Sequence, residues 1–143
     1  MDPIKIHLVQ SSWSRMIPIS DAASVMFYNR LVEIDPSTKI LFIGDMTDQG
    51  RKLMQMITVA VNGLHDLDSL IPVVQDLGGS HYRYGVTDSH YGSVASALLW
   101  TLENGLGDAF TPEVKSAWTE AYMLLTSVMK DAAGKQAEAT KAA

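Results

Sequence analysis

Apolar residues recur at intervals of three and four along almost the whole chain, and this spacing places them on one face of successive helices. No stretch shows the strict alternation of apolar and polar residues that indicates a half-buried strand. Proline, glycine and capping residues interrupt the helical pattern, so the sequence predicts an all-α fold. The expected helices span residues 3–17, 20–34, 47–65, 70–81, 87–105 and 112–132, with a tight helical turn over 36–42.

Several helix starts carry capping signals. Asp2-Pro3 and Thr111-Pro112 each pair a capping side chain with a proline at the first helical position, where its missing N–H needs no partner. Thr47 and Thr87 mark two further starts. Residues 133–143 have no apolar stripe, so we expect them to form a flexible tail after a single domain over residues 1–132.

The composition excludes several classes of protein. A chain that is 47% hydrophobic and 19% charged fits a globular domain rather than a disordered one. The net charge of -5, with 11 scattered Lys and Arg, argues against nucleic acid or an anionic membrane as the main partner. Because there is no cysteine, disulfides, thiolate metal sites and covalent thioether attachment of a cofactor are excluded.

Neither a membrane span nor a secretory signal is expected. No apolar run approaches the length of a spanning helix. The first residues lack the long apolar core of a signal peptide. We therefore expect a cytoplasmic protein, whose oligomeric state the sequence leaves open.

The stretch from Leu70 to Val86 contains the main candidate for a binding side chain. An apolar helical run leads into His81, and a segment containing glycine follows. This arrangement would hold an imidazole at the end of a helix. Taken alone, such a histidine is more often structural, and Tyr28 is more often a core tyrosine.

Short motifs occur in a specific order along nearly the whole chain. They are Ser12-Trp13, Phe27-Tyr28-Asn29-Arg30-Leu31, Leu41-Phe42, Arg51-Lys52-Leu53-Met54-Gln55, Leu70-Ile71-Pro72 through to His81, Gly85-Val86, Asp88-Ser89-His90-Tyr91, Phe110-Thr111-Pro112, Ala117-Trp118 and Tyr122. No single motif is diagnostic, but together they resemble the globin family, and within it single-domain bacterial globins related to flavohaemoglobins and neuroglobins. The resemblance implies a three-over-three helical sandwich around a haem.

The resemblance also implies roles for individual residues. His81 matches the proximal iron ligand of a non-covalent haem b, and Phe42 matches the phenylalanine that stacks on the haem. Tyr28 and Gln49 match the distal residues that contact the bound ligand. Tyr91 matches a tyrosine near the proximal histidine. The other candidates for haem contact are Leu53, Val74, Leu77 and Val94.

Two positions depart from the related families. Gln49 stands where neuroglobins have a distal histidine, and glutamine is a poor iron ligand. We therefore expect the sixth coordination position to stay open until a ligand arrives. Ala133 stands where flavohaemoglobins have a glutamate near the proximal tyrosine, and Asp131 is out of register, so the roles of Asp131 and Tyr91 stay open. Lys52 would reach either a haem propionate or solvent.

Fold does not decide among functions. Two hydrogen-bond donors, Tyr28 and Gln49, predict reversible oxygen binding with high affinity and slow release, since each charge-assisted bond contributes roughly 1.5–3 kcal/mol. Carbon monoxide would gain less. The alternative is a nitric oxide dioxygenase served by a separate ferric reductase. A gas sensor is the least favoured function, and a haem absorption band would exclude a plain helical bundle without cofactor.

Overall fold

The computed structural model describes residues 1–41, 45–83 and 86–142; the side chains of residues 80–83, 88 and 136–142 lie outside the described part. Its helices are α1 (Pro3–Met16), α2 (Ser20–Ile34), α3 (Met46–Asn62), α4 (Leu67–Arg83), α5 (Asp88–Leu106) and α6 (Pro112–Ala142). Three short 3-10 segments join them: η1 (Ile17–Ile19), η2 (Pro36–Leu41) and η3 (Gly107–Ala109). The described residues contain no strand, which confirms the all-α prediction.

The predicted caps at the starts of the first and last helices, α1 and α6, are confirmed. The Asp2 carboxylate accepts the Ile4 N–H at 2.8 Å, and the Thr111 hydroxyl accepts the Val114 N–H at 3.2 Å. Thr87 caps α5 as expected. That helix ends at Gly107, whose positive φ of 57° suits a residue without a side chain.

The bounds of α3 and α4 differ from the sequence prediction. The cap of α3 is Asp45, whose carboxylate accepts the Thr47 N–H at 2.8 Å, so Thr47 lies inside the helix. Helix α4 begins at Leu67, directly after Asp66, and continues to Arg83, beyond the expected end at His81. Pro72 therefore lies inside α4, where the loss of its N–H removes a single helical hydrogen bond.

Helix α6 also extends further than expected. Its backbone is helical to Ala142, whereas the sequence prediction ended the helix at residue 132. The added residues are rich in Ala, Lys, Glu and Gln, which have high helix propensity. Helical turns without an apolar face to pack are only marginally stable in water. We therefore still expect this segment to be flexible, and this stays a prediction.

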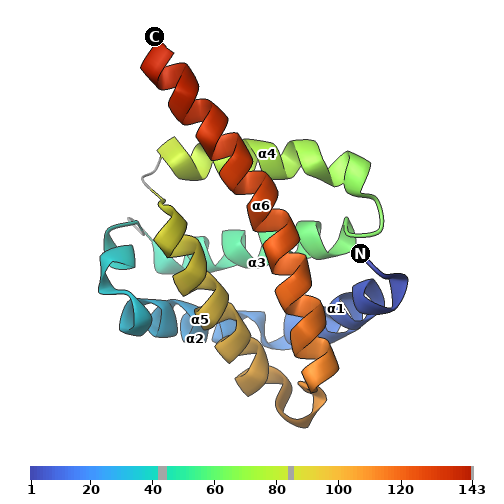
Figure 1. Cartoon of the computed structure of the whole chain (residues 1–143). Helices are drawn as coiled ribbons and strands as arrows, with labels where there is room; N and C mark the ends of the chain where they lie inside the picture. The colour runs from blue at the N-terminus through green and yellow to red at the C-terminus, as the bar shows by residue number, and fades with distance from the viewer. Residues whose placement is uncertain (42–44, 84–85, 143) are drawn as a thin grey trace.

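The long helix α6 connects two parts of the molecule. Figure 1 shows its first half beside α1 and its second half crossing α4, in agreement with the packing of these helices. Helix α2 packs against α3 and α5. At the crossing of α4 and α6, a Cβ added at Gly78 would overlap the main chain of Met129, so glycine permits the close approach of these two helices.

The buried apolar residues of the described part form two clusters. The first draws on α1, α2, α3, α5 and α6 and includes Phe27, Tyr28 and Trp118. The second lies where α4 meets α5 and the second half of α6, and consists of Leu70, Val74, Tyr91 and Met129. No helix among the described residues has the length and apolar character needed to cross a membrane.

Candidate functional site

The structure brings together the two predicted distal residues. Tyr28 is buried in α2, with its ring edge-on to Phe27 at a centroid distance of 5.3 Å. Its hydroxyl donates a hydrogen bond to the main-chain carbonyl of Gln49, in the first turn of α3, at 3.1 Å. The Gln49 residue itself is half-buried. Tyr28 and Gln49 therefore adjoin, although they lie on different helices.

The protonation state of Tyr28 follows from its burial. Desolvation disfavours the phenolate and raises the pKa of Tyr28 to about 12. The hydroxyl therefore keeps its proton at neutral pH. It remains able to donate a hydrogen bond, whether to the Gln49 carbonyl or to another acceptor.

Two predicted apolar contacts lie at the edge of the first cluster. Leu53 is one turn after Gln49 in α3, and Val94 is in α5. Both are half-buried and pack against the first cluster without belonging to its buried interior. Both therefore lie against the cluster that contains Tyr28.

The other predicted contacts belong to the second cluster. Val74 and Tyr91 are buried within it, and Leu77 is half-buried against it. His81 lies in the last turn of α4, four residues after Leu77, and its side chain is outside the described part. Phe42 falls at a position that the structure does not describe.

The division of the core fits a flat apolar group such as haem. Tyr28 lies in the first cluster, with Leu53 and Val94 packed against it, whereas Val74 and Tyr91 lie in the second, with Leu77 packed against it. The partly exposed faces of Leu53, Leu77 and Val94 supply apolar surface. Imidazole is a suitable axial ligand, and the sequence supplies one at His81.

Tyr91 has two partners on α6 among the described residues. The Tyr122 hydroxyl donates to the Tyr91 carbonyl at 2.5 Å, and the Lys130 ammonium lies 5.5 Å from the centre of the Tyr91 ring. Asp131 is exposed and pairs with Lys135 at 3.4 Å. The Lys130 ammonium thus faces the Tyr91 ring, and Asp131 pairs with Lys135.

The sequence analysis did not single out His90 as a capping residue. His90 is in the first turn of α5, but it is only 9% exposed and its ring contacts Thr87 and Ser37. A capping box pairs Ser or Thr with Glu or Gln three residues later. The spacing of Thr87 and His90 matches that pattern, with histidine as the acceptor, and is the signal that could have identified it.

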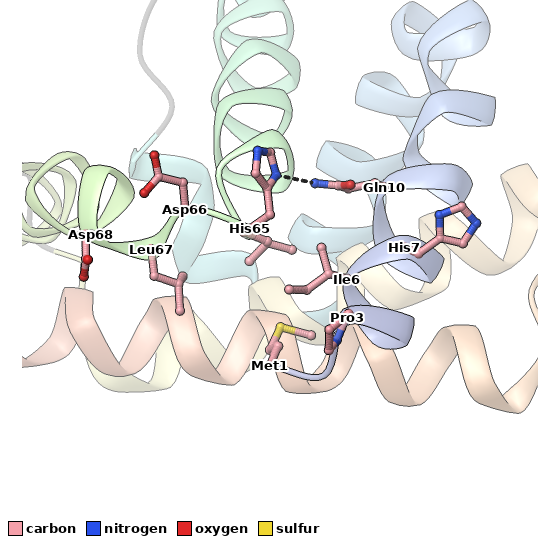
Figure 2. A pocket seen from close by; sticks show the side chains of 10 residues that line it. Met1, Pro3, Ile6, His7, Gln10, His65, Asp66, Leu67 and Asp68 are labelled. Carbon is pink, nitrogen blue, oxygen red and sulfur yellow. Dashed lines mark hydrogen bonds between the residues drawn. The ribbon is translucent and has the colours of Figure 1, made fainter.

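Two surface hollows lie elsewhere, and no predicted site residue lines either of them. One, of about 620 Å³, is between the start of α1 and the link from α3 to α4. Figure 2 shows Gln10 and His65 in it, joined by a hydrogen bond of 3.2 Å. The other, of about 770 Å³, follows the exposed face of α6 around Met123.

Comparison with known proteins identifies the class. The family model described as globin matches residues 25–129. The chain belongs to the globin family, and the helical arrangement described above is a globin fold. Membership implies haem binding and the binding of diatomic gases.

Three of the relatives that match the chain are proteins with different names. The chain is 28% identical to a neuroglobin of Chaenocephalus aceratus, over 92% of each protein. It is 30% identical to a protein of Oryza sativa subsp. indica named as an anaerobic nitrite reductase, over 92% of this chain and 94% of the relative. A flavohemoprotein of Bacillus subtilis (strain 168) is 29% identical over 85% of this chain, which matches 31% of that longer protein.

Proposed function

We propose that the protein binds oxygen reversibly, with high affinity and slow release, on a non-covalent haem b held by His81. The observation that carries this proposal is the pairing of the buried Tyr28 hydroxyl with Gln49 beside a divided apolar core. This pairing provides a polar group at the edge of the apolar surface that suits a haem. The proposal assigns the protein to the cytoplasm.

The haem, when bound, supplies the iron at which a diatomic gas is held. The imidazole of His81 would hold the iron from α4, and the side chains of Leu53, Leu77 and Val94 would exclude water from the ligand. Excluding water strengthens every hydrogen bond made inside the pocket. Val74 and Tyr91 would support this wall from the second cluster, and Phe42 would cover the opposite haem face.

Tyr28 and Gln49 would act on the ligand through hydrogen bonds. The Tyr28 hydroxyl can turn from the Gln49 carbonyl to a ligand that carries partial negative charge, and the Gln49 amide can donate as well. Since a hydrogen bond to a charged group contributes roughly 1.5–3 kcal/mol, and about 1.4 kcal/mol is a factor of ten, one donor slows release by about tenfold or more. Carbon monoxide, being less polar, gains less.

The alternative function is a nitric oxide dioxygenase, and similarity to a flavohemoprotein favours it. In that reaction oxygen, nitric oxide and one electron give nitrate. A distal donor that retains oxygen would serve this reaction as well as storage. Turnover would need an external reductase to supply the electron.

Nitric oxide consumption in oxygenated solution separates the two functions. The haem-loaded protein is mixed with repeated additions of nitric oxide, with and without a flavin reductase system, while nitrate and the haem spectrum are followed. A single burst of nitrate equal to the protein, unchanged by the reductase, supports oxygen binding as the function. Sustained nitrate formation with the reductase would overturn that proposal in favour of the dioxygenase.

A further inference from the structure

His90 is held in one orientation by its own helix. Its Nδ1 atom accepts the Thr87 N–H at 3.0 Å, which completes a capping box at the start of α5. An acceptor at Nδ1 requires that this nitrogen carries no proton. The neutral ring then has its proton on Nε2.

The Nε2 atom faces the end of α2. It lies 3.2 Å from the Ser37 hydroxyl, and that hydroxyl donates to the Asp35 carboxylate at 2.5 Å. Because Ser37 gives its proton to Asp35, its oxygen is free to accept from Nε2–H. The hydrogen bonds therefore run in one direction, from the Thr87 amide through His90 and Ser37 to Asp35.

Asp35 is anchored from both sides of this junction. One carboxylate oxygen accepts the Ser37 N–H at 3.1 Å as well as its hydroxyl, and the other accepts the Ser93 hydroxyl at 3.0 Å. The Ser37 hydrogen bond is the main cause that lowers the pKa of Asp35, with smaller contributions from Ser93 and His90. The carboxylate thus stays ionised and acts as the acceptor that ends the chain.

We propose that Asp35, Ser37 and His90 form a positioning relay that fixes the start of α5 against the turn between α2 and η2, and thereby sets the place of Tyr91. Tyr91 follows His90 directly and lies in the second cluster with Val74. If the position of Tyr91 affects the proximal side of a bound haem, that effect rests on the function proposed above. The relay itself rests only on the described contacts.

The relay predicts a response to acid. A second ring proton on His90 would put N–H groups of His90 and Thr87 face to face, so the cap would open. Asp35 adjoins the ring through the Ser37 hydroxyl, on the side of α2 and η2. Closure of the relay therefore needs the neutral ring.

Three variants separate the relay from general stability. Glutamine at position 90 can accept from the Thr87 amide and donate to Ser37, and it does not titrate, so His90→Gln keeps the relay and removes its response to acid. His90→Ala removes both contacts. Ser37→Ala breaks the link to Asp35 while leaving the cap of α5. His7→Gln, at an exposed position of α1, is the matched control.

The first readout is the nitrogen-15 NMR spectrum of the imidazoles in the full-length protein. The relay predicts that His90 is protonated on Nε2 only, and that Ser37→Ala shifts the Nε2 resonance because its acceptor is removed. Urea unfolding should give a fall of about fivefold in the folded-to-unfolded ratio for His90→Ala, with His90→Gln close to the parent. A ring protonated on Nδ1, or a Ser37→Ala spectrum identical to the parent, overturns the relay.

The second readout is the iron–histidine stretching band of the haem-loaded protein in resonance Raman spectra. Ser37→Ala should shift this band at neutral pH. His90→Gln should keep its position but lose its change on acidification, and His7→Gln should alter neither. A band that does not move in Ser37→Ala overturns the effect of the relay on the haem side. A protein that takes up no haem refutes the proposed function instead, and the NMR result then decides whether the relay exists.

Discussion

The Tyr28 hydroxyl donates to the main-chain carbonyl of Gln49 at 3.1 Å, and this bond joins α2 to the first turn of α3. The acceptor is main chain, so it persists whatever side chain stands at position 49. The donor is buried and keeps its proton. Tyr28 therefore has a defined resting partner from which it can turn to a bound ligand.

Replacement of Tyr28 by phenylalanine should speed oxygen release by about tenfold or more, because the bound ligand loses a donor worth roughly 1.5–3 kcal/mol. The ring and its edge-on contact with Phe27 are retained. Stopped-flow displacement of oxygen by carbon monoxide measures the rate. Carbon monoxide dissociation is the internal control and should change less. An oxygen release rate equal to that of the parent would refute the distal hydrogen bond.

The raised pKa of Tyr28 predicts a loss of stability in alkaline solution. The phenol titrates near pH 10 in the unfolded chain and at about 12 in the folded one. The folded state holds its proton more tightly, so the stabilisation is present below pH 10 and is lost as the pH rises towards 12. Urea unfolding from pH 9 to 12 should show this fall, and Tyr28→Phe should reduce it. Parallel profiles for the two proteins would contradict the prediction.

The crossing of α4 and α6 should not tolerate a side chain at Gly78. In Gly78→Ala the new methyl group meets the main chain of Met129, so we expect the free energy of unfolding to fall by about 1–3 kcal/mol. Gly92→Ala is the control, because no atom lies within 4 Å of its added Cβ. That change should be neutral or stabilising by about 0.5–1 kcal/mol, since alanine favours the helix. Equal denaturation midpoints for Gly78→Ala and the parent would show that the helices can separate without cost.

Local signals predicted much of the fold. The caps at Asp2, Thr87 and Thr111 depend on residues within three positions, so the sequence alone locates them. The end of α4 was expected at His81, whereas the helix continues to Arg83 with Pro72 inside it. The length of α6 was missed because the search for an apolar stripe gave no weight to helix propensity.

Contacts between distant parts of the chain could not be predicted. Nothing near Gly78 in the sequence points to Met129, and nothing near His90 points to Ser37. The candidate site was predicted through resemblance to a family, since an isolated tyrosine, glutamine or histidine carries little information. The structure adds the carbonyl acceptor of Tyr28 and the two clusters on which the predicted residues lie.

The buried hydrogen bond between Trp118 and Ser12 should contribute to stability. The indole N–H donates to the Ser12 hydroxyl at 2.8 Å, next to the edge-on ring of Trp13. Ser12→Ala leaves that N–H without its acceptor, which costs about 1–3 kcal/mol. Ser14→Ala, at an exposed position of the same helix, should change the free energy of unfolding by less than about 0.5 kcal/mol. Thermal or urea denaturation gives both values, and a Ser12→Ala protein as stable as the Ser14→Ala protein would exclude a contribution from this bond.

The most direct test of the central claim is a titration of the haem-free protein with haem, followed by absorption spectroscopy in the reduced state with and without oxygen. The account predicts one haem per chain, a spectrum that changes reversibly with oxygen, and loss of normal haem retention in His81→Ala. Full and stable haem loading of His81→Ala with an unaltered spectrum would contradict the proximal assignment. The absence of any specific haem spectrum in the parent protein would contradict the proposed function as a whole.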